Sequence, residues 1–145
     1  MLYGRDRMDI REVFFRAWQD YRKQLPLEGI AKLIVAVAIN HPEYRASLEN
    51  REQYQDKDYT PEHGETNPFL HMGMHITLEE QIATDRPVGI QRLYQQIRQR
   101  LNDEHEAQHA MMDCLGDILW QAQQENKPPD EQVYLQCLQE LLKKA

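Results

Sequence analysis

Apolar residues recur along most of the chain at intervals of three and four, the spacing that places them on one face of an α-helix. The pattern predicts six longer helices, over residues 9–25, 27–40, 67–84, 87–101, 104–124 and 130–142. A short helix around residues 43–48 is also expected. No segment alternates apolar and polar residues with a period of two, so we expect no sheet. The predicted fold class is all-α, a single-domain bundle of five or six helices over residues 1–145.

Capping residues and one polar stretch mark the predicted boundaries. Asn67, Asp85, Asp103 and Asp130 each precede an apolar periodic segment, where their side chains can accept hydrogen bonds from the first free amides of a helix. The helix over residues 27–40 is apolar nearly all round, so we expect it to be the most buried one. Residues 50–67 are polar and contain a proline and a glycine, which predicts a long polar loop.

Composition narrows the classes of function. The chain has 145 residues, with 17 basic against 24 acidic side chains and a net charge of −7, which argues against a nucleic-acid partner. The longest apolar run, residues 29–39, is shorter than the roughly 20 residues of a membrane span, so no membrane partner is expected. No secretory signal is visible, and we expect a cytoplasmic protein. Two cysteines far apart in sequence, Cys114 and Cys137, favour reduced thiols over a disulfide.

Candidate chemistry lies in two histidine pairs, His71 with His75 and His105 with His109. Each pair is spaced by four residues on a predicted helix, so its two imidazoles lie on one side about one turn apart. A carboxylate follows each pair after four more residues: Glu79 on the first helix and Asp113 on the second. If the two helices pack together, these groups form a ligand set suited to Zn²⁺ and acceptable to Fe²⁺, Mn²⁺ or Ni²⁺.

Plainer interpretations compete with the metal site. His71 and His75 share their stripe with Leu78 and Ile82, which favours core histidines satisfied by hydrogen bonds. Residues 105–109 spell H-E-x-x-H, a zinc-protease signature, but such enzymes use a strand beside the motif helix and none is predicted. The E-x-x-H of a di-iron bundle lacks a second copy. Trp18 and Trp120 lie in amphipathic helices and are expected to be packing anchors.

The segments NPFLHMGMH, residues 67–75, and CLGDILWQAQ, residues 114–123, resemble a family of short proteobacterial proteins catalogued as a domain of unknown function, DUF1841. The likeness extends over most of the chain. It implies a small helical cytosolic protein without an assigned activity, substrate or cofactor, and it supplies no catalytic residue. A looser likeness to metal-binding four-helix bundles of the DinB type favours His105 and His109 as a ligand pair, with His71 or His75 as the third ligand.

Two functional hypotheses follow from these observations. The first is a divalent metal site built from His71, His75, His105 and His109, with Glu79 and Asp113 as additional ligands or as partners that orient the imidazoles. The second is a non-enzymatic adaptor or dimerising protein, in which the histidines are structural and the surface binds a second copy or another protein. The sequence alone does not decide between the two, and it does not decide whether the protein is an enzyme.

Overall fold

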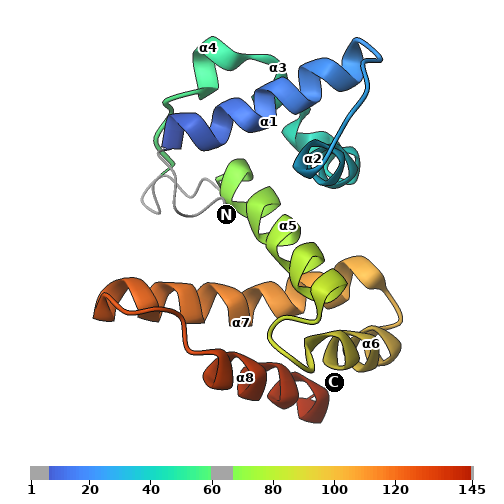
Figure 1. The fold of residues 1–145 in the computed structure, drawn as a ribbon, viewed down its shortest axis with the longest axis vertical. Coiled ribbons are helices and arrows are strands. Elements are labelled where there is room, and N and C mark those ends of the chain that lie inside the picture. The colour runs from blue at the N-terminus through green and yellow to red at the C-terminus, as the bar shows by residue number, and fades with distance from the viewer. Residues whose placement is uncertain (1–6, 60–66, 145) are drawn as a thin grey trace. The chain divides into compact units, whose positions relative to one another are not determined.

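The computed structural model describes residues 7–59 and 67–144. Those residues form eight α-helices and one short 3-10 helix without a strand, which confirms the all-α prediction (Figure 1). Six of the helices have ten or more residues, in keeping with the five or six expected. In chain order the elements are α1 (Arg7–Arg22), α2 (Ile30–Ile39), η2 (Pro42–Tyr44), α3 (Arg45–Glu49), α4 (Arg51–Tyr54), α5 (Pro68–Thr84), α6 (Ile90–Leu101), α7 (Glu104–Glu125) and α8 (Glu131–Lys144).

The chain divides into two compact units, Met1–Ile76 and Thr77–Ala145. The boundary falls inside α5, so this one continuous helix contributes its first half to unit 1 and its second half to unit 2. Each unit is described by itself below. Whether residues 1–145 behave as a single domain stays a prediction.

Unit 1 is built around α1, which packs against α2 and α3. Phe69, at the start of α5, meets the rings of Phe14 and Phe15 edge-on, with centroids 5.8 and 5.6 Å apart. The expectation that α2 is the most buried helix is wrong, because Ile30 and Ile39 are 37% and 50% exposed. Only one face of α2 is buried; it carries Ile34, Val35, Val37 and Ala38.

Arg11 of α1 forms hydrogen bonds with the end of α4 and with the segment that follows it. Its side chain is only 3% exposed, and one guanidinium nitrogen donates to the carbonyl oxygens of Tyr54 and Lys57, at 2.9 and 2.8 Å. The same guanidinium lies 4.9 Å from the ring centre of Phe69 and 5.5 Å from that of Tyr59. Its hydrogen bonds and ring contacts allow a buried charge to stabilise the segment through residue 59.

Unit 2 is formed by the second half of α5 with α6, α7 and α8, and the last three helices contact one another.

The predicted caps are present in both units, at Asn67, Asp103 and Asp130, where each side chain accepts a hydrogen bond from a backbone amide of the first helical turn. Asp85 accepts from the amides of Gly89 and Gln91, although α6 begins at Ile90 rather than at residue 87. The largest fully buried side chains of unit 2 include Leu78, Ile90, Ile97, Met111, Leu115, Tyr134 and Leu138.

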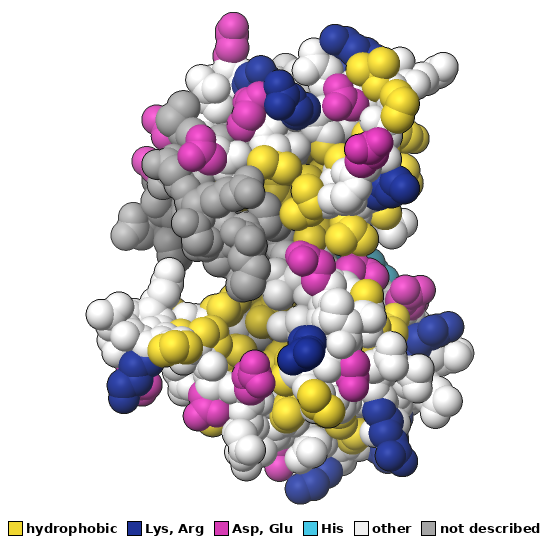
Figure 2. All heavy atoms as spheres, viewed as in Figure 1, with side chains coloured by type: hydrophobic (Ala, Val, Ile, Leu, Met, Phe, Trp, Pro, Cys, Tyr) yellow, Lys and Arg dark blue, Asp and Glu magenta, His cyan; other side chains and the backbone are white. Residues whose placement is uncertain are grey.

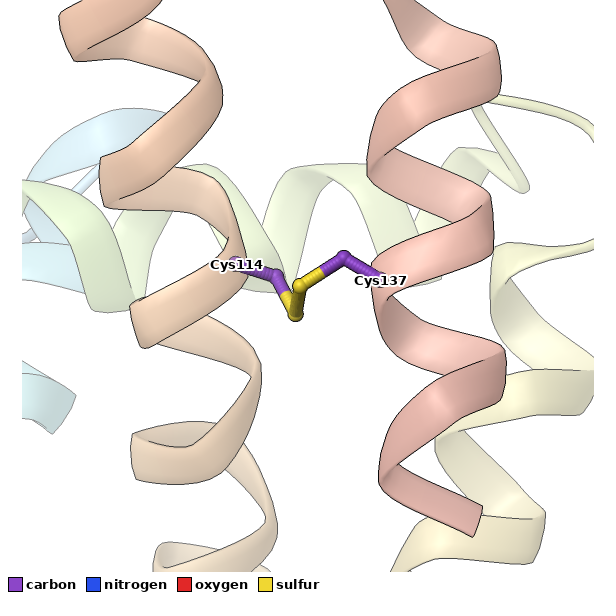
Figure 3. The surroundings of a disulfide bond; sticks show 2 residues. All are labelled: Cys114 and Cys137. Atoms are coloured by element: carbon purple, nitrogen blue, oxygen red, sulfur yellow. A yellow bond between two sulfur atoms is a disulfide. The ribbon is translucent and has the colours of Figure 1, made fainter. Parts of the chain in front are cut away.

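The prediction of reduced cysteines is wrong in this structure, because Cys114 of α7 and Cys137 of α8 form a disulfide (Figure 3). Their Cα atoms are 5.8 Å apart although 23 positions separate them in sequence. The two helices are joined by a short turn and pack against each other, so residues distant in sequence face each other across the hairpin. The distance in sequence between Cys114 and Cys137 therefore did not indicate whether they form a disulfide.

Several surface features complete the fold. Trp120 is 62% exposed and is not the packing anchor that its helix predicted, whereas Trp18 is 4% exposed as expected. The predicted polar loop over residues 50–67 contains the short helix α4, and its residues 60–66 lie outside the described residues. Among the described residues, no helix has the length and apolar character needed to cross a membrane. Acidic and basic side chains are interspersed on the face drawn in Figure 2.

Candidate metal centre

Unit 1 gathers three histidines. His71 and His75 lie one turn apart on α5, and His41 lies in the turn between α2 and η2. The ring centroids of the three imidazoles are 5.0 Å apart for His41 and His71, 4.9 Å for His41 and His75, and 4.9 Å for His71 and His75. His41 and His75 are buried, at 3% and 2% exposure, and His71 is half-buried. The predicted neighbourhood of His71 and His75 is thus confirmed, and His41 joins it.

The ring of His41 has a defined orientation. Its Nδ1 atom lies 2.8 Å from the carbonyl oxygen of Val37, one turn earlier at the end of α2. A carbonyl oxygen can only accept, so the hydrogen is on Nδ1 and a neutral ring has its lone pair on Nε2. That Nε2 atom is shielded from solvent. A backbone carbonyl that fixes one nitrogen and leaves the other to coordinate is the usual support for a metal-binding histidine.

The spacing of these rings suits a shared ion. Three imidazoles around one tetrahedral Zn²⁺, each with a nitrogen about 2.0 Å from the metal, have ring centres roughly 5 Å apart. The three distances in unit 1 match this value.

Tyr44 of η2 closes one side of the group. Its ring stacks on His41 with a centroid distance of 5.4 Å and an angle of 3° between the planes, and it meets His71 edge-on at 5.8 Å. Burial, with a smaller contribution from the charge of Glu43, raises the pKa of the Tyr44 hydroxyl above its ordinary value. Tyr44 is therefore a neutral aromatic wall at physiological pH, and it restrains the plane of His41.

Unit 2 carries the second pair. His105 and His109 lie in the first two turns of α7, with ring centroids 4.1 Å apart and an interplanar angle of 66°. Both rings are half-buried, and the Nε2 atom of His109 is shielded from solvent. The amide of Glu106 donates to the carboxylate of Asp103, at 3.0 Å, which caps the helix start and holds the turn that carries His105.

The two predicted carboxylates differ from each other. Glu79 is half-buried, and its carboxylate accepts a hydrogen bond of 2.5 Å from the side-chain amide of Gln108. Asp113, at the equivalent position after His109, is exposed. The bond between Glu79 and Gln108 joins α5 to α7 within unit 2, and Gln108 is the residue before His109. The matching spacing in the sequence therefore produces two different environments.

His41 is the residue that the sequence pattern underrated. It lies 30 positions before His71, next to a proline, and it is not part of the predicted ligand set. A buried helix ending in Asn40 and His41 was the available signal, because a polar residue that directly follows a buried segment is often drawn into the core. The H-E-x-x-H interpretation finds no support, since Glu106 is exposed and the described residues contain no strand to align a substrate.

Comparison with known proteins identifies one relationship. A family model described as a domain of unknown function, DUF1841, matches residues 6–140. No similar curated protein and no similar solved structure was found. The match covers nearly the whole chain, and the description of the family names no activity, ligand or partner.

Proposed function

We propose that this chain, which belongs to the DUF1841 family, binds one divalent transition-metal ion through histidine side chains. The candidate ligands are His41, His75, His105 and His109, each offering one ring nitrogen. His71 is the alternative ligand beside His75. Such a ligand set is suited to Zn²⁺ and acceptable to Fe²⁺, Mn²⁺ or Ni²⁺.

The orientation of His41 is the observation that carries this proposal. The carbonyl oxygen of Val37 fixes the ring plane and the tautomer of His41 through Nδ1, which is how a backbone carbonyl commonly supports a metal-binding histidine. Its Nε2 atom is buried, and the centroid of its ring lies 5.0 Å from that of His71 and 4.9 Å from that of His75. In unit 2, the bond between Glu79 and Gln108 holds α7, which carries His105 and His109, beside the second half of α5.

The number of imidazole ligands decides what the ion does. Four imidazoles complete a tetrahedral shell, and a closed shell makes the ion a structural element that stabilises the fold. Three imidazoles and one water would leave a position where a substrate can bind. In the proposed site Glu79 serves as a partner that holds α7 through Gln108, and Asp113 does not coordinate because its side chain is exposed.

Zinc titration of the tag-free chain tests the proposal. We expect one equivalent to bind with a Kd below about 1 μM, and saturation at 100 times the Kd to stabilise the fold by about 2.7 kcal/mol. His75→Ala and His105→Ala, one from each unit, should each weaken binding at least 100-fold. Asp113→Ala, which removes an exposed carboxylate that the proposed site does not use, is the control and should bind like the parent chain.

His105 is half-buried, so its truncation leaves the core intact, and circular dichroism without metal verifies that each variant folds. Equal zinc affinity in the parent chain, His75→Ala and His105→Ala would contradict the proposal. That result would favour the adaptor alternative, in which exposed apolar residues such as Trp120 contact a protein partner.

A cytoplasmic location is part of the proposal because the resemblance to DUF1841 implies a small cytosolic protein. The disulfide argues the other way, since such bonds persist mainly in oxidising compartments. Trapping the thiols of Cys114 and Cys137 in intact cells separates these two indications.

A further inference from the structure

Unit 1 contains an open cleft of about 850 Å³ between α1 and the α3–α4 segment. This volume lies within the range of roughly 300–1,000 Å³ that small-molecule sites occupy. Phe15, Trp18 and Leu48 line its floor, and each is less than 5% exposed. These three side chains belong to the core of the unit and present a small apolar area at the bottom of a largely polar cleft.

The rim of the cleft is rich in cations, although the chain as a whole carries a net charge of −7. Arg22 and Lys23 come from the end of α1, and Arg51 comes from α4. Two carboxylates, Glu49 and Glu52, line the same cleft. The lining side chains thus carry three positive and two negative charges.

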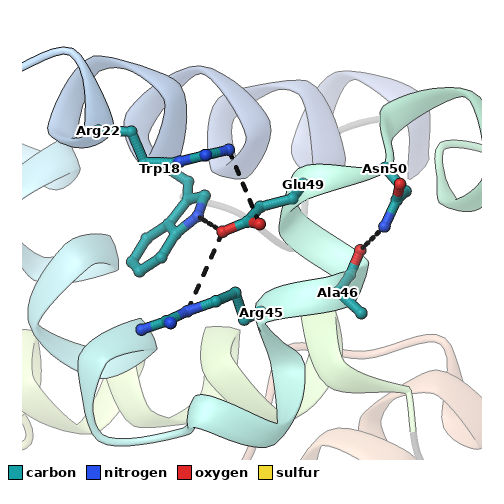
Figure 4. Close-up of polar contacts among 6 residues, drawn as sticks. All are labelled: Trp18, Arg22, Arg45, Ala46, Glu49 and Asn50. Carbon is teal, nitrogen blue, oxygen red and sulfur yellow. Dashed lines mark hydrogen bonds and ion pairs between the residues drawn. The ribbon is translucent and has the colours of Figure 1, made fainter.

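Glu49 is engaged by the protein itself (Figure 4). Its carboxylate accepts a hydrogen bond of 3.0 Å from the indole nitrogen of Trp18, and it pairs with Arg22 at 3.7 Å and with Arg45 at 4.0 Å. A carboxylate with three such partners orders the side chains around it and is poorly placed to attract a cation. The cleft therefore selects for negative charge.

The arginines keep donor capacity for a ligand. The contacts of Arg22 and Arg45 with Glu49 are longer than hydrogen bonds, which rarely exceed about 3.2 Å between nitrogen and oxygen. Arg51 uses one terminal nitrogen on Glu12, at 3.0 Å, and a guanidinium has five N–H donors. Arg51 also lies over the ring of Phe15, with 5.6 Å between its central carbon and the ring centre.

We infer that this cleft binds a small organic anion, with its carboxylate or phosphate group on Arg22 and Arg51 and its apolar part over Phe15 and Trp18. Guanidinium groups match the oxygens of carboxylates and phosphates with paired donors. The aromatic floor supplies the apolar contact that a simple inorganic ion would not use. The inference is independent of the proposed metal function, because none of these residues is a candidate metal ligand.

Tryptophan fluorescence provides the test. The chain has two tryptophans, so Trp120→Phe leaves Trp18 in the floor of the cleft as the single reporter. Titration of this variant with phenyl phosphate, and in parallel with benzoate, should give a saturable change for at least one of them. We expect a Kd below about 1 mM, and we expect this Kd to rise as salt is added, because salt screens the attraction between the arginines and the anion.

Matched arginine variants locate the ligand. Arg22→Ala and Arg51→Ala, at side chains that are 60% and 44% exposed, should each weaken binding at least tenfold without unfolding the unit. Arg92→Ala, an exposed arginine on α6 in unit 2, should not change the affinity. Phenol, which has the ring without the strong anion, should bind at least tenfold more weakly than phenyl phosphate.

Three outcomes would overturn the inference: no saturable signal with either anion by fluorescence and calorimetry, unchanged affinity in both Arg22→Ala and Arg51→Ala, or equal affinity for phenol. The measurement contains no metal, so its failure leaves the zinc titration unaffected.

Discussion

At the scale of single residues, buried polar side chains connect elements that are far apart in sequence. Tyr134 of α8 is 1% exposed, and its hydroxyl donates to the side-chain oxygen of Gln81 on α5, at 2.7 Å. Burial raises the pKa of this hydroxyl well above its ordinary value of 10.0, because the phenolate would lose its hydration inside the unit. The folded state therefore retains a proton that the unfolded chain releases at high pH.

Replacing Tyr134 with phenylalanine should change the alkaline stability of the protein. The stability that the raised pKa of Tyr134 contributes is complete below pH 10 and is lost as the pH rises further, because the unfolded chain then binds fewer protons than the folded one. At pH 8, Tyr134→Phe should lower the free energy of unfolding by about 1 kcal/mol, because the hydrogen bond to Gln81 is absent. Between pH 10 and 11, the free energy of unfolding should fall less in Tyr134→Phe than in the parent chain. Urea unfolding at several pH values measures both effects.

Tyr21→Phe is the control, since Tyr21 is 41% exposed and its replacement removes an equal hydroxyl group from the surface. Parallel pH profiles for the parent chain and Tyr134→Phe would contradict this account.

At the scale of helices, the capping residues predicted where several helices begin. The burial of each helix and the pairing of the cysteines depend on tertiary contacts instead. Asn67, Asp103 and Asp130 act on amides two or three residues away, so their roles could be predicted from the sequence. The apolar composition of residues 27–40 shows that α2 belongs in a core, but it does not show how many neighbours surround the helix. Ile39 is consequently half exposed on the helix that the sequence predicted to be the most buried. The pairing of Cys114 with Cys137 likewise depends on how α7 and α8 align, which no local pattern specifies.

Removing the disulfide should destabilise unit 2. A link that closes a loop of 23 residues restricts the unfolded chain, which corresponds to about 3 kcal/mol at 25 °C in the chain-entropy model. The double variant Cys114→Ala with Cys137→Ala should lose an amount of this order in urea unfolding. Dithiothreitol should lower the free energy of unfolding of the parent chain by a similar amount, and it should not change that of the double variant. A loss below about 1 kcal/mol, or an equal response of both proteins to the reductant, would contradict the prediction.

At the scale of the whole molecule, two compact units share one continuous helix, and the candidate ligands are distributed over both. The spacing of four residues correctly predicted which imidazoles are neighbours within each pair. The spacing could not predict that the fold of unit 1 places His41 beside His71 and His75. It also could not predict that Glu79 and Asp113 have different environments. The two carboxylates occupy the same place in the sequence pattern, and only the packing around α5 and α7 gives Glu79 a partner and leaves Asp113 exposed.

X-ray absorption at the zinc edge shows whether imidazoles of this chain share one metal ion. The tag-free protein is loaded with one equivalent of zinc and freed of excess metal. We expect about one zinc per chain, with a first shell of three or four nitrogens at about 2.0 Å and the outer-shell scattering of imidazole rings. A chain that retains less than about a tenth of an equivalent, or a shell of oxygen atoms without imidazole scattering, would contradict it.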